Sequence, residues 1–385
     1  MGSIGVLVVD DSVVIRRMVA SVLDDDPDIE VVGTASNGRI ALDKLPQLRP
    51  DIIILDVEMP VMDGLATLRA LRPTHPHLPV VMFSTLTERG ASATLDALAA
   101  GATDYVTKPS HVGSVNASIE RVRSELIPKI KGLVGATRER TSPGPRAAKV
   151  PPLQPVRQDR VDVIAVGCST GGPDALTAIV AGLPPDLAVP VVVVQHMPPL
   201  FTRLFAERLD RSCSLLVREA TDGLTLEPGQ ILVAPGDHHL TVRRVGLDIV
   251  AHLTKEPPEN YCRPSVDVLF RSVASVYGNN ALACVLTGMG RDGLKGAERI
   301  RAAGGRIVVQ DQASSVVWGM PGAVAGAGLA NDIVPLSRMT ETLVTAVGPA
   351  RRAGGHRLLP ASPPAQTPVA AGIAMTPVRT LGSSW

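Results

Sequence analysis

Short runs of valine, isoleucine and leucine alternate with amphipathic stretches over the first third of the chain. The apolar runs cover residues 6–9, 30–35, 52–55, 80–83 and 104–107. Near-continuous apolar strands separated by helical patterns are typical of a parallel sheet that is buried on both faces. We therefore predict a doubly wound α/β domain over residues 1–127.

A second pattern of the same kind begins at residue 160 and extends to residue 347. Strands are expected at 161–166, 190–194, 231–234, 281–286 and 306–309, and helices at 264–276 and 292–302. Two alternating runs, 240–243 and 247–253, flank Val245 and Gly246 and predict an antiparallel hairpin. The fold class is thus α/β, with two doubly wound, mostly parallel sheets.

The remaining two segments lack an apolar period. Residues 128–159 are rich in Pro, Gly, Arg and Lys, which predicts a flexible linker between the domains. Residues 348–385 consist largely of Pro, Ala, Gly and Ser, which predicts a disordered tail.

Composition narrows the class of protein. The 385 residues carry 38 Lys and Arg against 37 Asp and Glu, and only 2% are aromatic, so nucleic acid is not an expected partner. No basic N-terminal region and no apolar stretch of bilayer-spanning length are present, so we expect a cytoplasmic protein without direct membrane insertion. Four scattered cysteines without a CxxC pair indicate reduced structural thiols. His238, His239 and His252 lack suitably spaced partner ligands, and zinc is not expected there.

Three carboxylates are expected at one edge of the first sheet. Asp10 and Asp11 follow the first strand and Asp56 ends the third. Carboxylates so close together need a cation, and Mg²⁺ prefers such oxygen ligands. A carboxylate beside that ion could attack a phosphoryl group. Lys108 would then offset the charge on the phosphoryl oxygens, and Ser84 could donate a hydrogen bond to the bound phosphoryl group. Each aspartate could instead cap a helix, but that alternative explains the set less well.

The full set of motifs resembles the receiver domain of two-component response regulators. It comprises Asp10-Asp11-Ser12, the stretch 55–64, Phe83-Ser84-Thr85 and Tyr105-Val106-Thr107-Lys108-Pro109. The resemblance implies a flavodoxin-like fold, phosphorylation of Asp56 by a histidine kinase, and Mg²⁺ bound by Asp10, Asp11 and Asp56. It also implies Ser84 as the switch hydroxyl, Tyr105 as the switch aromatic, Lys108 as the phosphate-contacting cation and a cis bond at Lys108–Pro109.

A serine lies on a predicted strand-to-helix turn in the second domain. Gly167-Cys168-Ser169-Thr170-Gly171 contains Gly-x-Ser-x-Gly, in which the glycines allow a sharp turn and expose the hydroxyl. His196 and Asp292 follow two other predicted strands, so a base and its orienting carboxylate are expected at the same edge. The alternatives are a glycine-rich phosphate loop for the turn, a structural role for His196 and a helix cap for Asp292.

The order Ser169, His196, Asp292 disfavours the alpha/beta-hydrolase family, whose acid precedes its histidine. The motifs around these residues, with 234–236 and 263–267, resemble the CheB family of protein-glutamate methylesterases and glutamine deamidases. The resemblance implies a Rossmann-like domain that demethylates and deamidates chemoreceptors, giving chemotactic adaptation. It also implies Ser169 as nucleophile, His196 as base, Asp292 as orienter, and the amides of Met289 and Thr170 at the oxyanion. We expect a monomer and no cofactor at the hydrolase site.

The two domains together suggest how the protein is regulated. We hypothesise that the unphosphorylated receiver packs over the hydrolase edge and that phosphorylation of Asp56 shifts the equilibrium away from that packing. Rival hypotheses are a receiver-controlled nucleotide-binding domain, and a hydrolase that acts on a receptor outside chemotaxis. A DNA-binding output is disfavoured by the length and neutral charge of the second domain.

Overall fold

The computed structural model describes residues 2–109, 115–141 and 160–348. These residues belong to one compact unit, Met1–Ala350. The predicted tail beyond residue 348 lies outside the described residues. No helix in the described part of the chain is long and apolar enough to cross a bilayer.

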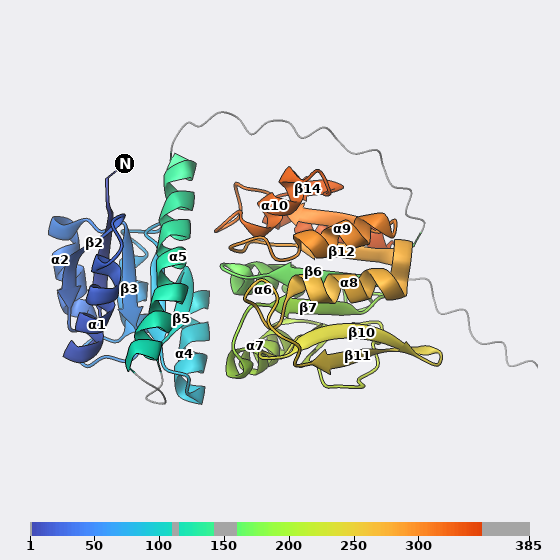
Figure 1. The fold of residues 1–385 in the computed structure, drawn as a ribbon, viewed down its shortest axis with the longest axis horizontal. Helices are drawn as coiled ribbons and strands as arrows, with labels where there is room; N and C mark the ends of the chain where they lie inside the picture. The colour runs from blue at the N-terminus through green and yellow to red at the C-terminus, as the bar shows by residue number, and fades with distance from the viewer. Residues whose placement is uncertain (1, 110–114, 142–159, 349–385) are drawn as a thin grey trace, which may run out of the picture. The chain divides into compact units, whose positions relative to one another are not determined.

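The first domain is a five-stranded parallel sheet with helices on both faces (Figure 1). The strand order β2-β1-β3-β4-β5 is the flavodoxin-like order. The strands are β1 (Ile4–Val9), β2 (Ile29–Ala35), β3 (Ile52–Asp56), β4 (Val80–Ser84) and β5 (Asp104–Thr107). The helices are α1 (Val13–Asp24), α2 (Gly38–Leu48), α3 (Gly64–Leu71), α4 (Glu88–Ala99) and α5 (Val115–Thr141).

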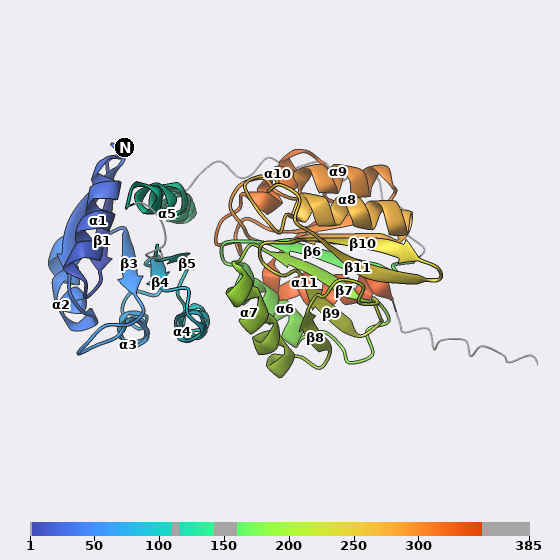
Figure 2. The same cartoon turned by 60° about the horizontal axis from the view of Figure 1, so that its bottom comes forward.

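Alternation along the strands divides the core of this domain into two layers. In β1, Val6 and Val8 pack with α1 and α5, whereas Leu7 and Val9 pack on the opposite face. Figure 2 shows α1 and α5 on one side of the sheet and α2, α3 and α4 on the other. Because both faces are covered, every residue of β1, β3, β4 and β5 is buried.

The second domain is a seven-stranded parallel sheet in the order β14-β13-β12-β6-β7-β9-β8. Its strands are β6 (Val163–Cys168), β7 (Val191–Gln195), β8 (Leu216–Glu219), β9 (Gln230–Val233), β12 (Ala281–Val285), β13 (Arg306–Gln310) and β14 (Asp332–Val334). Its helices are α6 (Gly172–Ala181), α7 (Pro199–Ser212), α8 (Val266–Tyr277), α9 (Leu294–Ala302), α10 (Met320–Gly326) and α11 (Leu336–Val347), with a 3₁₀ turn at Gly278–Asn280. The predicted hairpin is confirmed as β10 (His239–Val245) and β11 (Asp248–Thr254).

The α/β class and both parallel sheets are confirmed, but two strands were missed. β8 and β14 are edge strands of four and three residues, and neither has a fully buried pattern. An edge strand faces a neighbour on one side only, so its sequence needs no continuous apolar run. Because β8 and β14 are short and partly exposed, they lack the continuous apolar run by which the central strands were predicted.

The predicted linker begins too early. Helix α5 continues to Thr141, so residues 128–141 are helical and the prediction is wrong there. Ile130, Leu133 and Val134 are buried against the first domain at helical spacing, an apolar period that the high content of charged residues obscured. Residues 142–159 lie outside the described residues.

The expected cis bond at Lys108–Pro109 is also wrong. Among the described residues the cis peptide bond is Arg263–Pro264. The bond before a proline permits either isomer, and the sequence does not choose between them.

The packing of α5 can be tested by substitution. Leu133→Ala should lower the free energy of unfolding by about 2–5 kcal/mol, because a buried leucine leaves a cavity. The measurement is the urea-induced unfolding transition of the full chain. Glu120→Ala on the exposed face of the same helix is the matched control and should change stability by less than about 0.5 kcal/mol. Equal stability of the Leu133→Ala variant and the wild type would contradict this packing.

Candidate active site

Ser169 lies in the turn between β6 and α6. Gly171 has a φ of 74°, and a Cβ at this position would lie 2.5 Å from Cγ2 of Val316, so glycine is required twice over. The amide of Ser169 donates to the carbonyl of Thr287 at 3.1 Å, and that of Gly172 donates to the carbonyl of Ser169 at 2.7 Å. Two amides of the loop are therefore already bonded within the protein, which disfavours a phosphate cradle here.

The sheet order brings the three predicted residues to one edge. β12, β6 and β7 are neighbours, and Asp292, Ser169 and His196 follow their carboxyl ends. Nε2 of His196 lies 2.8 Å from Oδ2 of Asp292, and the two side chains are 14% and 3% exposed. No hydrogen bond joins Ser169 to His196 in the described residues; Nδ1 of His196 instead faces Sγ of Cys262 at 3.5 Å.

Asp292 is the most heavily bonded carboxylate of the site. Its Oδ1 accepts from Nδ2 of Asn260 and from Oγ of Ser265, each at 2.8 Å. Its Oδ2 accepts from the amide of Val266, at the N-terminus of α8, at 2.7 Å. Burial alone would raise the pKa of Asp292, but His196 and these donors lower it to about 2. Asp292 is therefore a carboxylate throughout the neutral range.

His196 responds to the same contact in the opposite direction. Burial by itself lowers the pKa of the imidazole, but the hydrogen bonds to Asp292 and Cys262 outweigh it and raise the pKa to about 10. The ionised partner stabilises the imidazolium form. At neutral pH His196 therefore holds a proton, and it can act as a base only after it has lost that proton.

Two residues that support Asp292 were not predicted from the sequence. Asn260 precedes α8 in a loop where both Asn260 and Tyr261 have positive φ, 53° and 62°. Ser265 is the N-cap residue of α8, but its hydroxyl does not bond the helix and donates to Asp292 instead. An N-cap pattern predicts the start of the helix, and nothing in the sequence placed either Ser265 or Asn260 against Asp292.

In the described part of the chain, Arg263 and the three histidines of the hairpin region do not bond His196 or Asp292 directly. Arg263 pairs with Asp237. His238, His239 and His252 each contact a different partner, namely the carbonyl of Gly236, the carbonyl of Pro257 and the carboxylate of Asp222. The described residues hold no metal-like cluster that includes these histidines.

The acidic cluster of the first domain lies as predicted at the edge of its sheet. Asp10, Asp11 and Asp56 each offer an oxygen within 4.8 Å of the others, a donor set that fits a hard divalent cation. Nζ of Lys108 lies 2.7 Å from Asp10 and 2.8 Å from Asp56. Burial raises the pKa of Asp56 to about 6, although Lys108 acts in the opposite direction.

The side chains of Ser84 and Tyr105 form no hydrogen bond with Asp56 in the described residues but bond or pack against other residues. Ser84 is fully buried and its hydroxyl donates to the carbonyl of Gly90 in α4 at 3.0 Å, rather than to Asp56. Tyr105 is 6% exposed, and its ring stacks on Phe201 of α7 with centroids 4.5 Å apart and planes 8° apart. Tyr105 thus contacts the second domain.

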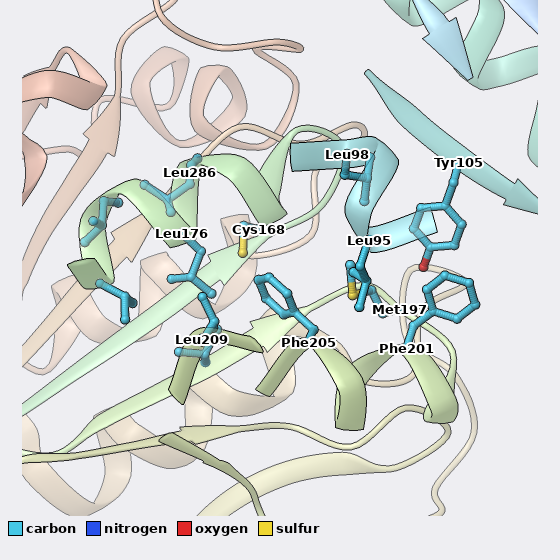
Figure 3. Close-up of a cluster of buried hydrophobic side chains, with 14 of the residues drawn as sticks. Leu95, Leu98, Tyr105, Cys168, Leu176, Met197, Phe201, Phe205, Leu209 and Leu286 are labelled. Carbon is cyan, nitrogen blue, oxygen red and sulfur yellow. The ribbon is translucent and has the colours of Figure 1, made fainter. Parts of the chain in front are cut away.

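Further contacts join the same two domains. Figure 3 shows Leu95 and Leu98 of α4 beside Met197, Phe201 and Phe205, in one cluster of buried side chains. Oγ1 of Thr170, next to Ser169, donates to Oδ2 of Asp104 at 2.6 Å. Arg208 of α7 pairs with Asp96 of α4 at 2.6 Å. The receiver-type domain therefore contacts the residue adjacent to the candidate nucleophile.

The fold and the two sites define a class of protein, a receiver domain joined to an α/β domain of the serine-hydrolase type. Two family comparisons agree with this. The CheB methylesterase family matches residues 164–343, and the response regulator receiver domain matches residues 6–120.

Curated relatives match most of the chain. A protein-glutamate methylesterase/protein-glutamine glutaminase of a Nocardioides species is 56% identical over 87% of this chain and 93% of that protein. The protein of the same name from Trichodesmium erythraeum is 48% identical over 89% of this chain and 99% of that protein. A protein-glutamate methylesterase/protein-glutamine glutaminase 2 from Caulobacter vibrioides is 47% identical over 87% of this chain and 96% of that protein. The chain belongs to the CheB family of receiver-linked methylesterases.

The His196–Asp292 pair predicts a pH dependence that can be measured directly. The pKa of His196 should lie above 6.5 in the wild type and should fall in Asp292→Asn, where burial is no longer offset by a carboxylate. In the wild type this pair stabilises the fold fully between about pH 3.8 and pH 6.5. Its contribution is lost as pH rises through the raised pKa of His196 or falls through the lowered pKa of Asp292. The measurement is an NMR titration of the His196 ring.

Asp222→Asn is the matched control for this titration, because Asp222 contacts His252 rather than His196. It should leave the titration of His196 unchanged. An unchanged pKa of His196 in Asp292→Asn would show that the carboxylate does not control the imidazole.

Proposed function

We propose that this chain is a protein-glutamate methylesterase and protein-glutamine glutaminase that acts on the cytoplasmic domains of chemoreceptors. The proposal also makes phosphorylation of Asp56 by a chemotaxis histidine kinase the activating signal. The observation that supports it most strongly is the 2.8 Å contact between His196 and Asp292 at the edge that carries Ser169. The names of the curated relatives supply the substrate class.

The geometry favours a particular division of roles. Because Nε2 of His196 is bonded to Asp292, Nδ1 is the nitrogen that takes the proton from Ser169. Ser169 Oγ then attacks the carbonyl carbon of the glutamate methyl ester, and the protonated His196 returns the proton to the departing methanol. Water, activated by the same nitrogen, cleaves the acyl-enzyme to a glutamate carboxylate and free Ser169. A glutamine side chain follows the same path and releases ammonia.

Backbone amides are the proposed stabilisers of the negative oxygen. The amides of Thr170 and Met289 donate to no other group within the described part of the chain. An amide without an internal partner can donate to an oxyanion without breaking another hydrogen bond. Deprotonated His196 is required as the base, so activity should increase as pH rises through the pKa of this residue.

The receiver site has its own proposed chemistry. Asp10, Asp11 and Asp56 would hold Mg²⁺, which offsets charge on the transferred phosphoryl group. A carboxylate oxygen of Asp56 attacks the phosphorus of the kinase phosphohistidine, the P–N bond breaks as the kinase imidazole leaves, and Lys108 stabilises the resulting acyl phosphate. Ser84 turns from Gly90 to bond it, and Tyr105 senses the change.

Contacts between the domains connect phosphorylation to hydrolysis. In the unphosphorylated chain Tyr105 stacks on Phe201, and Asp104 accepts a hydrogen bond from Thr170 beside the nucleophile. A receptor segment would have to displace these receiver residues to reach Ser169. Movement of Ser84 and Tyr105 on phosphorylation would weaken the packing and free the edge. We also propose that the protein is a monomer.

Loss of the nucleophile tests the hydrolase assignment. Ser169→Ala should reduce methanol release from a methylated chemoreceptor fragment by at least about 10³-fold, because no other group supplies the attacking oxygen. Release by the wild type should rise when Mg²⁺ and a small phosphodonor are added. Ser214→Ala, which alters an exposed serine, should behave as the wild type does. Release that is equal in Ser169→Ala and the wild type would exclude Ser169 as the nucleophile.

A charge exchange tests the inhibitory contact. Asp96→Arg places like charges where Asp96 pairs with Arg208, so basal activity without phosphodonor should rise about twofold to fivefold, as expected for a partly exposed pair. Arg208→Asp in the Asp96→Arg chain restores opposite charges and should return the basal activity toward the wild-type value. A double variant that stays as active as Asp96→Arg would contradict the role of this contact.

A further inference from the structure

A thiol lies against the histidine of the candidate triad, and the proposed reaction does not use it. Sγ of Cys262 is 3.5 Å from Nδ1 of His196, the nitrogen left free by the bond to Asp292. Both side chains are partly exposed. Cys168 and Cys284, in contrast, are fully buried, and burial raises the pKa of both thiols well above the ordinary value. Cys262 is therefore an accessible soft ligand that adjoins a nitrogen ligand.

The separation of the two atoms matches the geometry of a tetrahedral metal site. With a Zn–N distance of about 2.05 Å and a Zn–S distance of about 2.3 Å, a tetrahedral angle places the nitrogen and the sulfur about 3.6 Å apart. The observed separation is 3.5 Å. The observed separation therefore matches that of a nitrogen and a sulfur bound to one zinc ion.

Asp292 completes the arrangement from behind the histidine. His196, Cys262 and Asp292 offer ligand atoms within 4.8 Å of one another. The oxygens of Asp292 already accept hydrogen bonds from Asn260, Ser265 and Val266, so the carboxylate is not free to bind a metal directly. It bonds Nε2 of His196 instead, and a carboxylate on the second ring nitrogen is the usual partner of a metal-bound histidine.

We propose that Nδ1 of His196 and Sγ of Cys262 form an inhibitory site for Zn²⁺ or a similar thiophilic cation. On binding, the Cys262 thiol and the protonated Nδ1 of His196 each lose a proton to solvent, and the resulting thiolate and neutral imidazole each donate an electron pair to the metal. The two remaining positions are filled by water. His196 can then no longer accept the proton of Ser169, so hydrolysis stops while the metal stays bound. The inhibition rests on the proposed function, whereas metal binding does not.

The binding test uses the full chain with Co²⁺ in place of Zn²⁺, because a cobalt–thiolate bond gives a near-ultraviolet charge-transfer band. The wild type should develop this band on titration with Co²⁺ and lose it on addition of Zn²⁺. Cys262→Ser should not develop it. Cys213→Ser, the matched control at another partly exposed thiol, should develop the same band as the wild type. Carboxylates such as those of the receiver site do not produce this band.

The activity test compares each variant with and without metal. Zn²⁺ should inhibit methanol release by the wild type reversibly, and a chelator should restore it. Half-inhibition of Cys262→Ser should require at least about tenfold more zinc, which corresponds to about 1.4 kcal/mol of lost binding free energy. Absence of the cobalt band in the wild type, a band that persists in Cys262→Ser, or equal zinc sensitivity of the two would each overturn the proposal.

The two proposals fail separately. A cobalt band that depends on Cys262, in a chain that releases no methanol under any condition, would retain the metal site and reject the proposed hydrolase. Methanol release by a chain that shows no cobalt band would retain the proposed hydrolase and reject the metal site.

Discussion

The buried carboxylate of Asp292 is the constraint on which the hydrolase edge depends. It follows β12, yet it bonds the histidine that follows β7, the N-terminus of α8 and the side chain of Asn260. A charge at 2% exposure is tolerated only when hydrogen bonds replace the lost water. The same bonds that make the burial possible therefore also fix the ring of His196 and the entrance to α8.

Both domains place their polar side chains at the carboxyl-terminal edge of a parallel sheet, but the two edges carry different chemical groups. Parallel strands end at a common edge, so residues that are far apart in the chain meet there. In the receiver the edge collects three carboxylates and Lys108, a set that suits a hard divalent cation. In the hydrolase it collects a hydroxyl, an imidazole and a single carboxylate. The contacts of Tyr105 and Asp104 with Phe201 and Thr170 bring the two edges into one regulated unit.

Much of the fold was accessible from the sequence, because central parallel strands are buried on both faces and must be almost entirely apolar. The strands that carry Asp10, Asp56, Ser169 and His196 all have this pattern. The predictions of secondary structure failed for elements that bury only one edge or one face. β8 and β14 lie at sheet edges, and the end of α5 buries only the stripe that contains Ile130 and Leu133 among charged neighbours.

The α/β class, the two parallel sheets and the positions of both groups of site residues at strand ends could be predicted from the amino-acid sequence. The reason is that strand burial and the presence of polar residues directly after strands are local properties of the chain. The packing of the elements was needed to show that Asn260 and Ser265 support Asp292, that Cys262 faces Nδ1 of His196 and that Tyr105 stacks on Phe201. These are contacts between loops and helices from different parts of the chain, and no periodic pattern encodes which side chains meet when the elements pack.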